Sequence, residues 1–227
     1  MTVTLITGAN KGIGLQIATQ LAEAGHTVYL GARDVAAGAA AADAIGARSV
    51  QLDVTDEESV TAAIRDIDAA EGVLDVLVHN AGILETGLDG PTALRMFDTN
   101  TIGMVRVTQA ALPLLARSSE AHVVAVSSSA GSFWAVTNPE RPEYGLPLAL
   151  YSASKAAMTM LTLQYAKAHP SIRFNAVEPG TAATDMTAAF GIGRSPEESA
   201  RVVTRLALQG SAAPTGTLQD EDGVLAW

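Results

Sequence analysis

Short runs rich in valine, isoleucine and leucine alternate with longer segments of helical periodicity along this 227-residue chain. Each short run predicts a strand, and the segment after it carries the apolar spacing and end signals of a helix. Strands that are apolar on both faces and separated by helices are typical of a parallel sheet covered on both sides. With right-handed crossovers we expect an α/β fold with a doubly wound, Rossmann-type and mostly parallel sheet.

The boundaries of the elements follow from the same patterns and from their turn residues. The predicted strands cover 2–7, 27–32, 49–54, 74–82, 122–128 and 172–180, with a short final strand after residue 215. The predicted helices cover 12–25, 35–46, 56–72, 93–117, 151–168 and 198–208, the fourth with a candidate bend at Pro113. No linker, repeat or low-complexity segment interrupts the alternation, so residues 1–227 are expected to form a single domain.

Composition excludes several classes of function. A formal charge of −10 argues against a nucleic-acid surface, and the absence of cysteine excludes disulfides and thiolate chemistry. No apolar run approaches the roughly 20 residues of a membrane span, and no basic segment precedes the first strand. We therefore expect a cytoplasmic protein without nucleic-acid or membrane partners. No metal is expected either, because the histidines are scattered: His26, His79, His122 and His169.

The segment TGANKGIG, residues 7–14, joins the first strand to the first helix and contains Gly8, Gly12 and Gly14. Glycines at such a junction allow a tight turn and let the backbone approach a pyrophosphate at the helix N-terminus. A glycine-rich turn without a ligand is the alternative. The position after a first strand favours a dinucleotide.

The end of the second strand indicates which dinucleotide binds. A carboxylate there suits the ribose 2′-hydroxyl of NAD, whereas basic residues suit the 2′-phosphate of NADP. Here Ala32 stands where the acid is expected and Arg33 follows it, while Lys11 adds a second cation from the glycine loop. Asp34 comes one position later and is free to pair with Arg33. An ordinary surface arginine is the alternative, but the two cations together predict NADP(H).

Tyr151 and Lys155 lie four positions apart in the otherwise bland segment ALYSASKAAM. In a helix they share one face, and a nearby ammonium lowers the pKa of a phenol, which makes a general acid/base. The alternative is a pair at the edge of an amphipathic helix.

These motifs, in this order and spacing, resemble the short-chain dehydrogenase/reductase family in its single-domain form, and the resemblance covers nearly the whole chain. It implies catalytic roles for Asn100, Ser128, Tyr151 and Lys155. The implied cofactor-binding residues come from the glycine loop, LDVTD, NAG, the catalytic helix and EPGTAATDM: Gly8, Asn10, Lys11, Gly12, Ile13, Gly14, Arg33, Asp53, Val54, Asn80, Ala81, Gly82, Tyr151, Lys155, Pro179, Gly180 and Thr184.

The resemblance also implies a division of labour among the catalytic residues. A substrate carbonyl oxygen would lie between the hydroxyls of Ser128 and Tyr151, and Tyr151 would donate the proton. Lys155 would hold the nicotinamide ribose and lower the Tyr151 pKa, and Asn100 would support a proton-relaying water. Ser127 and Ser129 are rivals for the serine role. Strand alternation argues against Ser127, and the family's spacing favours Ser128 over Ser129.

One segment departs from the family pattern. Tyr151 follows Ser128 by 23 residues, against about 13 in many members, and the extra segment lies at about 132–149. Carbonyl reductases of the family, which the motifs resemble most, carry an insertion here. It is expected either beside the substrate mouth or as a surface loop with buried aromatic anchors. It would also hinder tetramer packing, so a monomer or homodimer is favoured. The candidate substrate residues are Phe133, Trp134, Tyr144 and Met186.

The expected activity is NADPH-dependent reduction of an aldehyde or ketone, or the reverse oxidation of an alcohol. The expected substrate is a small and apolar molecule. A mobile lid over about 184–198 should contain a helix start at Ser195 and Pro196. A catalytically weak NADP-sensing regulatory protein is the alternative, and a sugar-nucleotide epimerase or dehydratase on the same fold ranks below it.

Overall fold

Seven strands form one parallel sheet in the order β3-β2-β1-β4-β5-β6-β7. The computed structural model describes the backbone of residues 1–227 and all side chains except those of Ala189 and Ser211. The strands are β1 (Val3–Thr7), β2 (Thr27–Ala32), β3 (Arg48–Gln51), β4 (Val76–His79), β5 (His122–Val126), β6 (Arg173–Val177) and β7 (Thr217–Gln219). The chain reverses its winding direction between the neighbours β1 and β4, where a doubly wound sheet has its ligand crevice.

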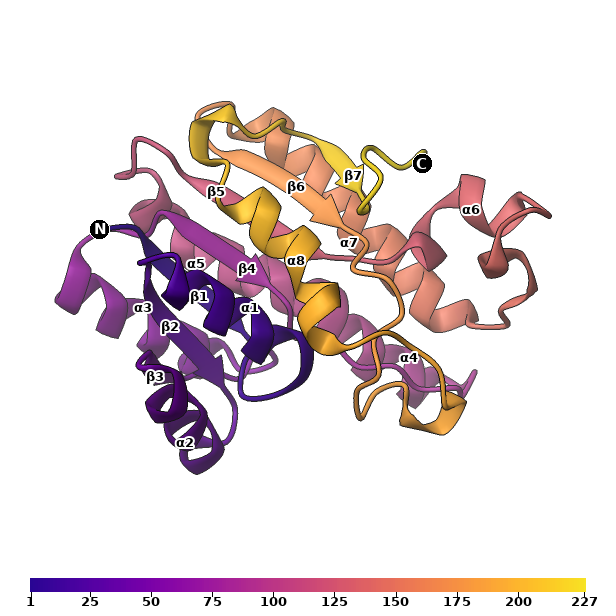
Figure 1. Ribbon diagram of the computed structural model, residues 1–227, viewed down its shortest axis with the longest axis horizontal. Helices are drawn as coiled ribbons and strands as arrows, with labels where there is room; N and C mark the ends of the chain where they lie inside the picture. Colours follow the sequence, from indigo (N-terminus) through magenta and orange to yellow (C-terminus); the bar gives the residue numbers. More distant parts are fainter.

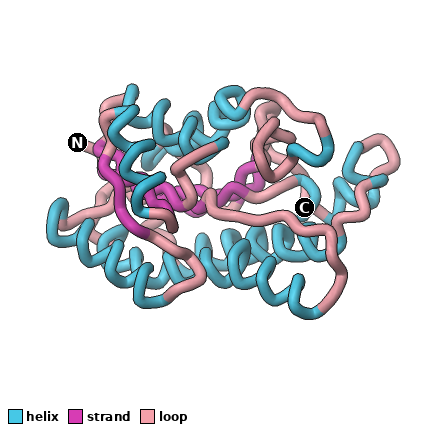
Figure 2. The backbone as a smooth tube through the Cα atoms, turned by 90° about the horizontal axis from the view of Figure 1, so that it is seen from below, coloured by secondary structure: helices cyan, strands magenta, loops and turns pink.

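Helices cover both faces of the sheet, which lies between two helical layers in the side view (Figure 2). One core joins the sheet to α1 (Gly12–Glu23), α2 (Val35–Ile45) and α8 (Pro196–Ala207). The other core involves α3 (Glu57–Glu71), α5 (Gly103–Leu115) and α7 (Ala149–Ala168). Every residue of β1, β4 and β5 is buried, as their apolar sequences require. The predicted fold class is therefore confirmed.

The prediction of one helix over residues 93–117 is wrong in two respects: the helix begins earlier, and a π-helical turn interrupts it. Helix α4 (Gly90–Phe97) begins three residues earlier, because Asp89 caps it by accepting from the Thr92 N–H at 2.8 Å. Residues Asp98–Ile102 then form a π-helical turn before α5 begins. Such turns are frequent at functional sites, and this one contains Asn100.

Three strands end three residues earlier than predicted, and β5 ends two residues earlier, at Val126. Strands β3, β4 and β6 end at Gln51, His79 and Val177, and the residues after them form loops. Those loops carry the LDVTD, NAG and EPG motifs, which places all three at the carboxyl edge of the sheet. The insertion also has structure of its own: α6 (Phe133–Thr137) and a 3₁₀ turn at Pro142–Gly145. It projects at one end of the molecule, beyond the C-terminus (Figure 1).

Among the helices that the structure describes, none combines the length and the apolar character needed to cross a membrane. Helix α8 begins as predicted, since Ser195 and Glu198 form a capping box and Pro196 occupies the first turn.

Candidate active site

The glycine loop forms a cradle that side chains would fill. Gly8 and Gly12 have φ values of 62° and 58°, in the left-handed region that favours glycine. A Cβ on Gly14 would lie 2.4 Å from Asn80 Nδ2, and one on Gly8 would lie 2.9 Å from Ala81 Cα. The absence of side chains therefore lets the loop pack against the NAG motif and leaves its backbone open to a phosphate at the start of α1.

The NAG motif is bonded to the glycine loop. The Asn80 side-chain amide donates to the carbonyls of Thr7 at 3.0 Å and Gly8 at 2.9 Å. The Thr7 hydroxyl accepts from the backbone N–H groups of Asn80 and Ala81, each at 3.0 Å. The ends of β1 and β4 are thereby fixed to each other at the switch point of the sheet.

Gly82 lies between two of the predicted catalytic residues. A Cβ on Gly82 would be 3.3 Å from Asn100 Oδ1 and 3.7 Å from Lys155 Nζ, so these groups converge. Fully buried Asn100 donates from Nδ2 to the Ile83 carbonyl at 2.9 Å and to Ser154 Oγ at 3.0 Å. Its Oδ1 accepts from the Ile83 N–H at 2.7 Å. The side chain thus fastens the loop after β4 to α7, and its support of a water stays a prediction.

Helix α7 brings Tyr151 and Lys155 to this edge of the sheet. Lys155 is 4% exposed, its Nζ donates to the Val126 carbonyl at 2.7 Å, and it lies 5.7 Å from the centre of the Tyr151 ring. Ser128 lies two residues beyond β5; its Oγ accepts from the Ala130 N–H at 3.2 Å, and its side chain is near enough to Tyr151 to lower the pKa of the phenol. The structure therefore brings together the four predicted catalytic residues, from β5, α7 and the π turn.

The electrostatics of this pair differ from the prediction. Burial raises the pKa of Tyr151, the nearby Glu178 carboxylate raises it further, and the Ser128 side chain opposes them. The expected lowering of that pKa by Lys155 is thus wrong in this structure. Burial also lowers the pKa of Lys155 to about 8, although Glu178 opposes this shift. Loss of hydration outweighs the mutual influence of the two groups.

The three consecutive serines have three different partners. Ser127 Oγ is 2.6 Å from Thr159 Oγ1 and donates to the Lys155 carbonyl at 3.2 Å, so it faces α7. Ser129 Oγ donates to the Glu143 carboxylate at 2.6 Å. Ser128 Oγ accepts from the Ala130 N–H at 3.2 Å, and of the three serines Ser128 is the one whose side chain affects the pKa of Tyr151. Its catalytic role stays a prediction.

The two cations expected to select the cofactor are both exposed. Lys11 Nζ is 2.6 Å from Asp185 Oδ2, a contact that joins the glycine loop to the segment expected to be a lid. Arg33 is exposed directly after β2. The Asp34 carboxylate has another partner than Arg33: it caps α2 by accepting from the Ala37 N–H at 2.9 Å. The interaction of Lys11 and Arg33 with a 2′-phosphate stays a prediction.

The residues expected around the adenine follow β3. Asp53 Oδ1 accepts from the N–H and hydroxyl of Thr55 at 2.9 and 2.7 Å, which forms a tight local turn. Val54 is buried, and a Cβ on Gly103 would lie 2.9 Å from its side chain. Both residues are held at the carboxyl edge of the sheet, and their contact with adenine stays a prediction.

Arg194 bonds back to the first residues of the segment that follows β6. The Arg194 N–H donates to the Thr181 carbonyl at 3.0 Å, and its carbonyl accepts from the Ala183 N–H at 2.8 Å. Its guanidinium donates to the Pro179 carbonyl at 2.7 Å and lies 3.0 Å from the Cβ position of Gly180. These contacts fix the start of the segment EPGTAATDM, which is predicted to bind the cofactor and is called the nicotinamide loop below. Residues 184–193 form an excursion from it. Thr184 approaches the cradle, 3.4 Å from the Cβ position of Gly12.

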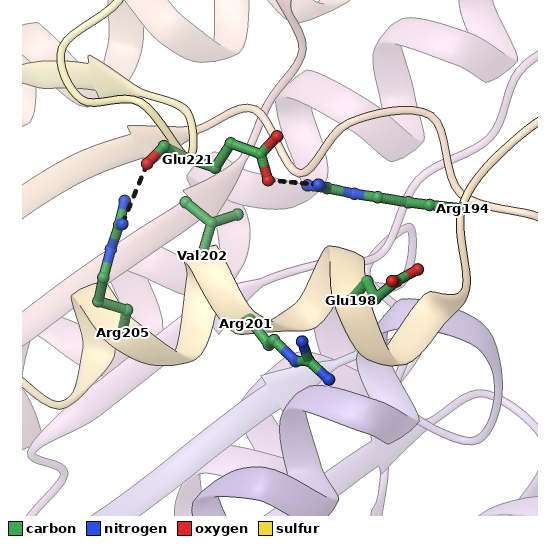
Figure 3. A pocket seen from close by; sticks show the side chains of 6 residues that line it. All are labelled: Arg194, Glu198, Arg201, Val202, Arg205 and Glu221. Atoms are coloured by element: carbon green, nitrogen blue, oxygen red, sulfur yellow. Dashed lines mark hydrogen bonds and ion pairs between the residues drawn. The ribbon is translucent and has the colours of Figure 1, made fainter.

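A cavity of about 360 Å³ lies beside Arg194 (Figure 3). It is lined by Arg194, Glu198, Arg201, Val202, Arg205 and Glu221. The Arg194 guanidinium pairs with the Glu221 carboxylate, and Arg205 donates to the Glu221 carbonyl at 3.1 Å. None of the predicted site residues lines it. Arg194 and Arg205 hold the C-terminal turn, and Arg201 pairs with Glu197 on its own helix at 3.0 Å. We assign this cavity a structural role.

The aromatic residues of the insertion point outward. Phe133 is 76% exposed, Tyr144 60% and Trp134 41%, so the expectation of buried aromatic anchors is wrong. Polar groups anchor the insertion instead: Glu143 is 8% exposed, and the N–H of Trp134 donates to the Trp227 carbonyl at 2.9 Å. Met186, the fourth candidate for substrate contact, is 38% exposed.

Sequence reasoning missed three charged residues that organise the site. Glu178 accepts from the Ser129 N–H and, at 2.6 Å, from the Gly180 N–H, which joins two loops of the site. Glu143 and Arg194 hold the insertion and the nicotinamide loop. An acid directly before Pro179 is a signal that was available for Glu178. Among the side chains that the structure describes, no cluster suited to a metal ion is found.

Comparison with known proteins gives a consistent result. The family model described as short chain dehydrogenase matches residues 2–194. A curated relative, the 3-oxoacyl-[acyl-carrier-protein] reductase of Staphylococcus aureus strain N315, is 34% identical over 220 residues, which span 90% of this chain and 82% of that protein.

Solved structures agree with the fold. Salutaridine reductase from Papaver somniferum matches with a TM-score of 0.84 at 27% identity, over 96% of this chain and 99% of that one. A gluconate 5-dehydrogenase from Burkholderia cenocepacia, solved in complex with NADP and tartrate, matches with a TM-score of 0.82 at 25% identity, over 96% and 92%.

Proposed function

The chain belongs to the short-chain dehydrogenase family of oxidoreductases, and from this premise we propose that it reduces the carbonyl group of a small, apolar aldehyde or ketone with NADPH. The observation that carries the proposal is the meeting of Ser128, Tyr151 and Lys155 at the carboxyl edge of the sheet, beside a glycine cradle. This is the arrangement that an acid/base reaction beside a dinucleotide requires.

The cradle and its neighbours fit a dinucleotide. The backbone of Gly8 to Gly14 would receive the pyrophosphate, because a Cβ on Gly14 or Gly8 would collide with the NAG motif. Lys11 and Arg33 would bind the 2′-phosphate, and both are exposed. The NADP in the structurally similar gluconate 5-dehydrogenase adds support for this cofactor. NADPH, when bound, supplies the hydride.

The chain's own residues supply the proton and the position of the substrate. The hydroxyls of Ser128 and Tyr151 would both donate to a carbonyl oxygen that takes a place between them. A raised pKa keeps the Tyr151 phenol protonated near neutral pH, which suits a proton donor. Lys155, with its pKa lowered to about 8, carries a proton at neutral pH and can return one to the phenolate.

This electrostatic arrangement favours reduction over oxidation at neutral pH. Alcohol oxidation needs Tyr151 as a base, and both its burial and the Glu178 carboxylate oppose its ionisation. Oxidation therefore requires a higher pH than reduction.

The regulatory alternative, an NADP sensor without turnover, has less support because all four catalytic positions are filled and brought together. We further propose that the protein acts in the cytoplasm as a monomer or homodimer.

The test is NADPH consumption against a panel of aldehydes and ketones that ranges from small aldehydes to aryl ketones, with NADH as the matched cofactor control. The proposal expects saturable oxidation of NADPH with at least one apolar carbonyl compound. Tight NADPH binding without turnover on any carbonyl would favour the sensor instead. Turnover with NADH equal to that with NADPH would refute the cofactor assignment alone.

A further inference from the structure

Ser129 stands between two carboxylates that reach it from opposite sides. Its backbone N–H donates to Glu178, which follows β6. Its hydroxyl donates to Glu143 Oε1 at 2.6 Å, and Glu143 belongs to the insertion, 14 residues further along the chain. The residue before it is Ser128, the predicted catalytic serine. Any displacement of Ser129 must therefore move the neighbouring Ser128.

Glu143 is built into the protein and is not a chance surface contact. The residue is 8% exposed, and a buried carboxylate is costly unless it is paired and hydrogen-bonded. Arg141 supplies the pairing, with Nη2 at 3.1 Å from Oε1 and Nε at 3.1 Å from Oε2. The Arg141 guanidinium is in turn 5.6 Å from the centre of the Trp134 ring. The carboxylate thus has a fixed orientation toward Ser129.

The rest of the serine loop offers little freedom. A Cβ on Gly131 would lie 2.6 Å from the Ala156 N, so the loop packs directly on α7. Ser132 Oγ donates to the Ala226 carbonyl at 2.7 Å on the opposite side. The loop is therefore confined between α7 and the C-terminal segment. Ser132 bonds it to the start of the insertion, accepting from the Ala135 N–H at 3.1 Å, and Ser129 bonds it to Glu143.

We propose that Glu143 is a positioning residue: through the Ser129 hydroxyl it fixes the loop that carries Ser128, the predicted catalytic serine. This inference rests on the proposed function for its catalytic consequence. It assigns the insertion a role in the reaction itself, independent of any contact with substrate. Because a misplacement of about 1 Å can cost on the order of 10²-fold in rate, loss of one anchoring bond is expected to lower kcat.

The first readout is kinetic. Ser129→Ala and Glu143→Ala are each expected to lower kcat about 10-fold, with the NADPH dissociation constant changed less than two-fold. The kcat of the double variant should be no lower than that of the less active single variant, because both changes remove the same bond. Glu143→Gln, which keeps an oxygen acceptor for Ser129, should lose less than Glu143→Ala. Glu140→Ala is the matched control, since Glu140 is an exposed acid in the same insertion.

The second readout does not need activity. Amide hydrogen exchange over residues 128–132 should accelerate in Ser129→Ala and Glu143→Ala, and stay unchanged in Glu140→Ala. Unchanged exchange together with wild-type kcat would overturn the positioning role. So would a loss of kcat in Glu140→Ala equal to that in Glu143→Ala, or a double variant in which the two losses multiply. An inactive wild type would refute the proposed function alone, and the exchange measurement would still decide whether Glu143 fixes the loop.

Discussion

The glycine loop at residues 7–14 and the insertion at residues 132–149 both border the candidate site, but they are held by different forces. The glycine loop is fixed by uncharged hydrogen bonds of the Asn80 amide and by close packing that leaves no room for a side chain at Gly14. The insertion is fixed by side-chain charges, chiefly the buried carboxylate of Glu143, and it exposes its aromatic residues.

The two regions differ in how well they tolerate amino-acid substitutions. Packing that excludes any side chain at Gly14 cannot accommodate another residue there, whereas an insertion held by a few polar bonds can change its exposed residues without loss of the fold. We therefore expect the first region to determine whether cofactor binds at all, and the second to determine which substrates react and how fast.

The largest effect is expected from a single methyl group in the glycine loop. A Cβ at residue 14 would lie 2.4 Å from Asn80 Nδ2 and 2.7 Å from the Gly8 carbonyl. Gly14→Ala should weaken NADPH binding at least about 10²-fold and destabilise the fold by about 1–3 kcal/mol, typical of overpacking. Fluorescence titration and urea unfolding measure the two effects. The control is Gly90→Ala, where nothing lies within 4 Å; equal behaviour of the two variants would contradict this account of the loop.

The next effect concerns the choice of cofactor. Ala32→Asp with Arg33→Ala places a carboxylate where a ribose diol can bind and removes one partner of the 2′-phosphate. Each charge-assisted bond to phosphate contributes roughly 1.5–3 kcal/mol, so we expect the preference to move toward NADH by on the order of 10². The ratio of kcat/KM for the two cofactors measures the change.

Two controls accompany the double variant Ala32→Asp with Arg33→Ala. Ala32 is 1% exposed, so thermal unfolding of the double variant tests whether the new carboxylate is tolerated. Arg33→Ala alone should produce only part of the shift. A wild type that uses NADH as well as NADPH would show that Lys11 and Arg33 do not select the cofactor.

A smaller effect is expected in the insertion. Trp134 is 41% exposed and lies beside Arg141. Trp134→Ala should raise KM several-fold for aromatic ketones and less for small aldehydes, because only the larger substrates would lose apolar contact. Leu208→Ala, which removes an exposed apolar side chain after α8, is the control. Equal changes in KM for both substrate classes would assign Trp134 to the structure of the insertion alone.

The smallest effect is expected where the lid segment meets the glycine loop. The Lys11 and Asp185 side chains are 68% and 80% exposed, and such ion pairs contribute only about 0–1 kcal/mol. Asp185→Asn releases Lys11 for the 2′-phosphate, so NADPH should bind up to about five-fold more tightly while the affinity for NADH stays constant. Calorimetric titration with both cofactors compares the two affinities. A parallel change in both would mean that Asp185 acts on the cleft as a whole.

The parts of the fold that depend on apolar periodicity and local caps could be predicted from the sequence. Strand β2 was predicted with its observed bounds, and the start of α8 at Ser195 and Pro196 follows from a capping box that the sequence displays. The motif residues Gly82, Asn100 and Lys155 were expected at one site, and the structure brings them within contact.

The remaining features depend on contacts between distant segments. The π turn at Asp98–Ile102 leaves no mark in the apolar spacing, because the periodicity of α4 continues into α5. The role of Glu143 depends on a bond to Ser129, and the raised pKa of Tyr151 depends on burial and on Glu178. None of these contacts can be derived from spacing along the chain.

The central claim is that Tyr151 donates the proton to the substrate oxygen, and Tyr151→Phe tests it most directly. The substitution removes the phenol hydroxyl and keeps the ring, so the cofactor cradle at Gly8 to Gly14 is unaffected. General acid groups contribute about 10²–10⁴-fold. The measurement is kcat with a carbonyl compound that the wild type reduces, together with the NADPH dissociation constant. We expect kcat to fall by at least about 10² with NADPH affinity unchanged; near-normal reduction by the variant would contradict the assignment of Tyr151 as the acid.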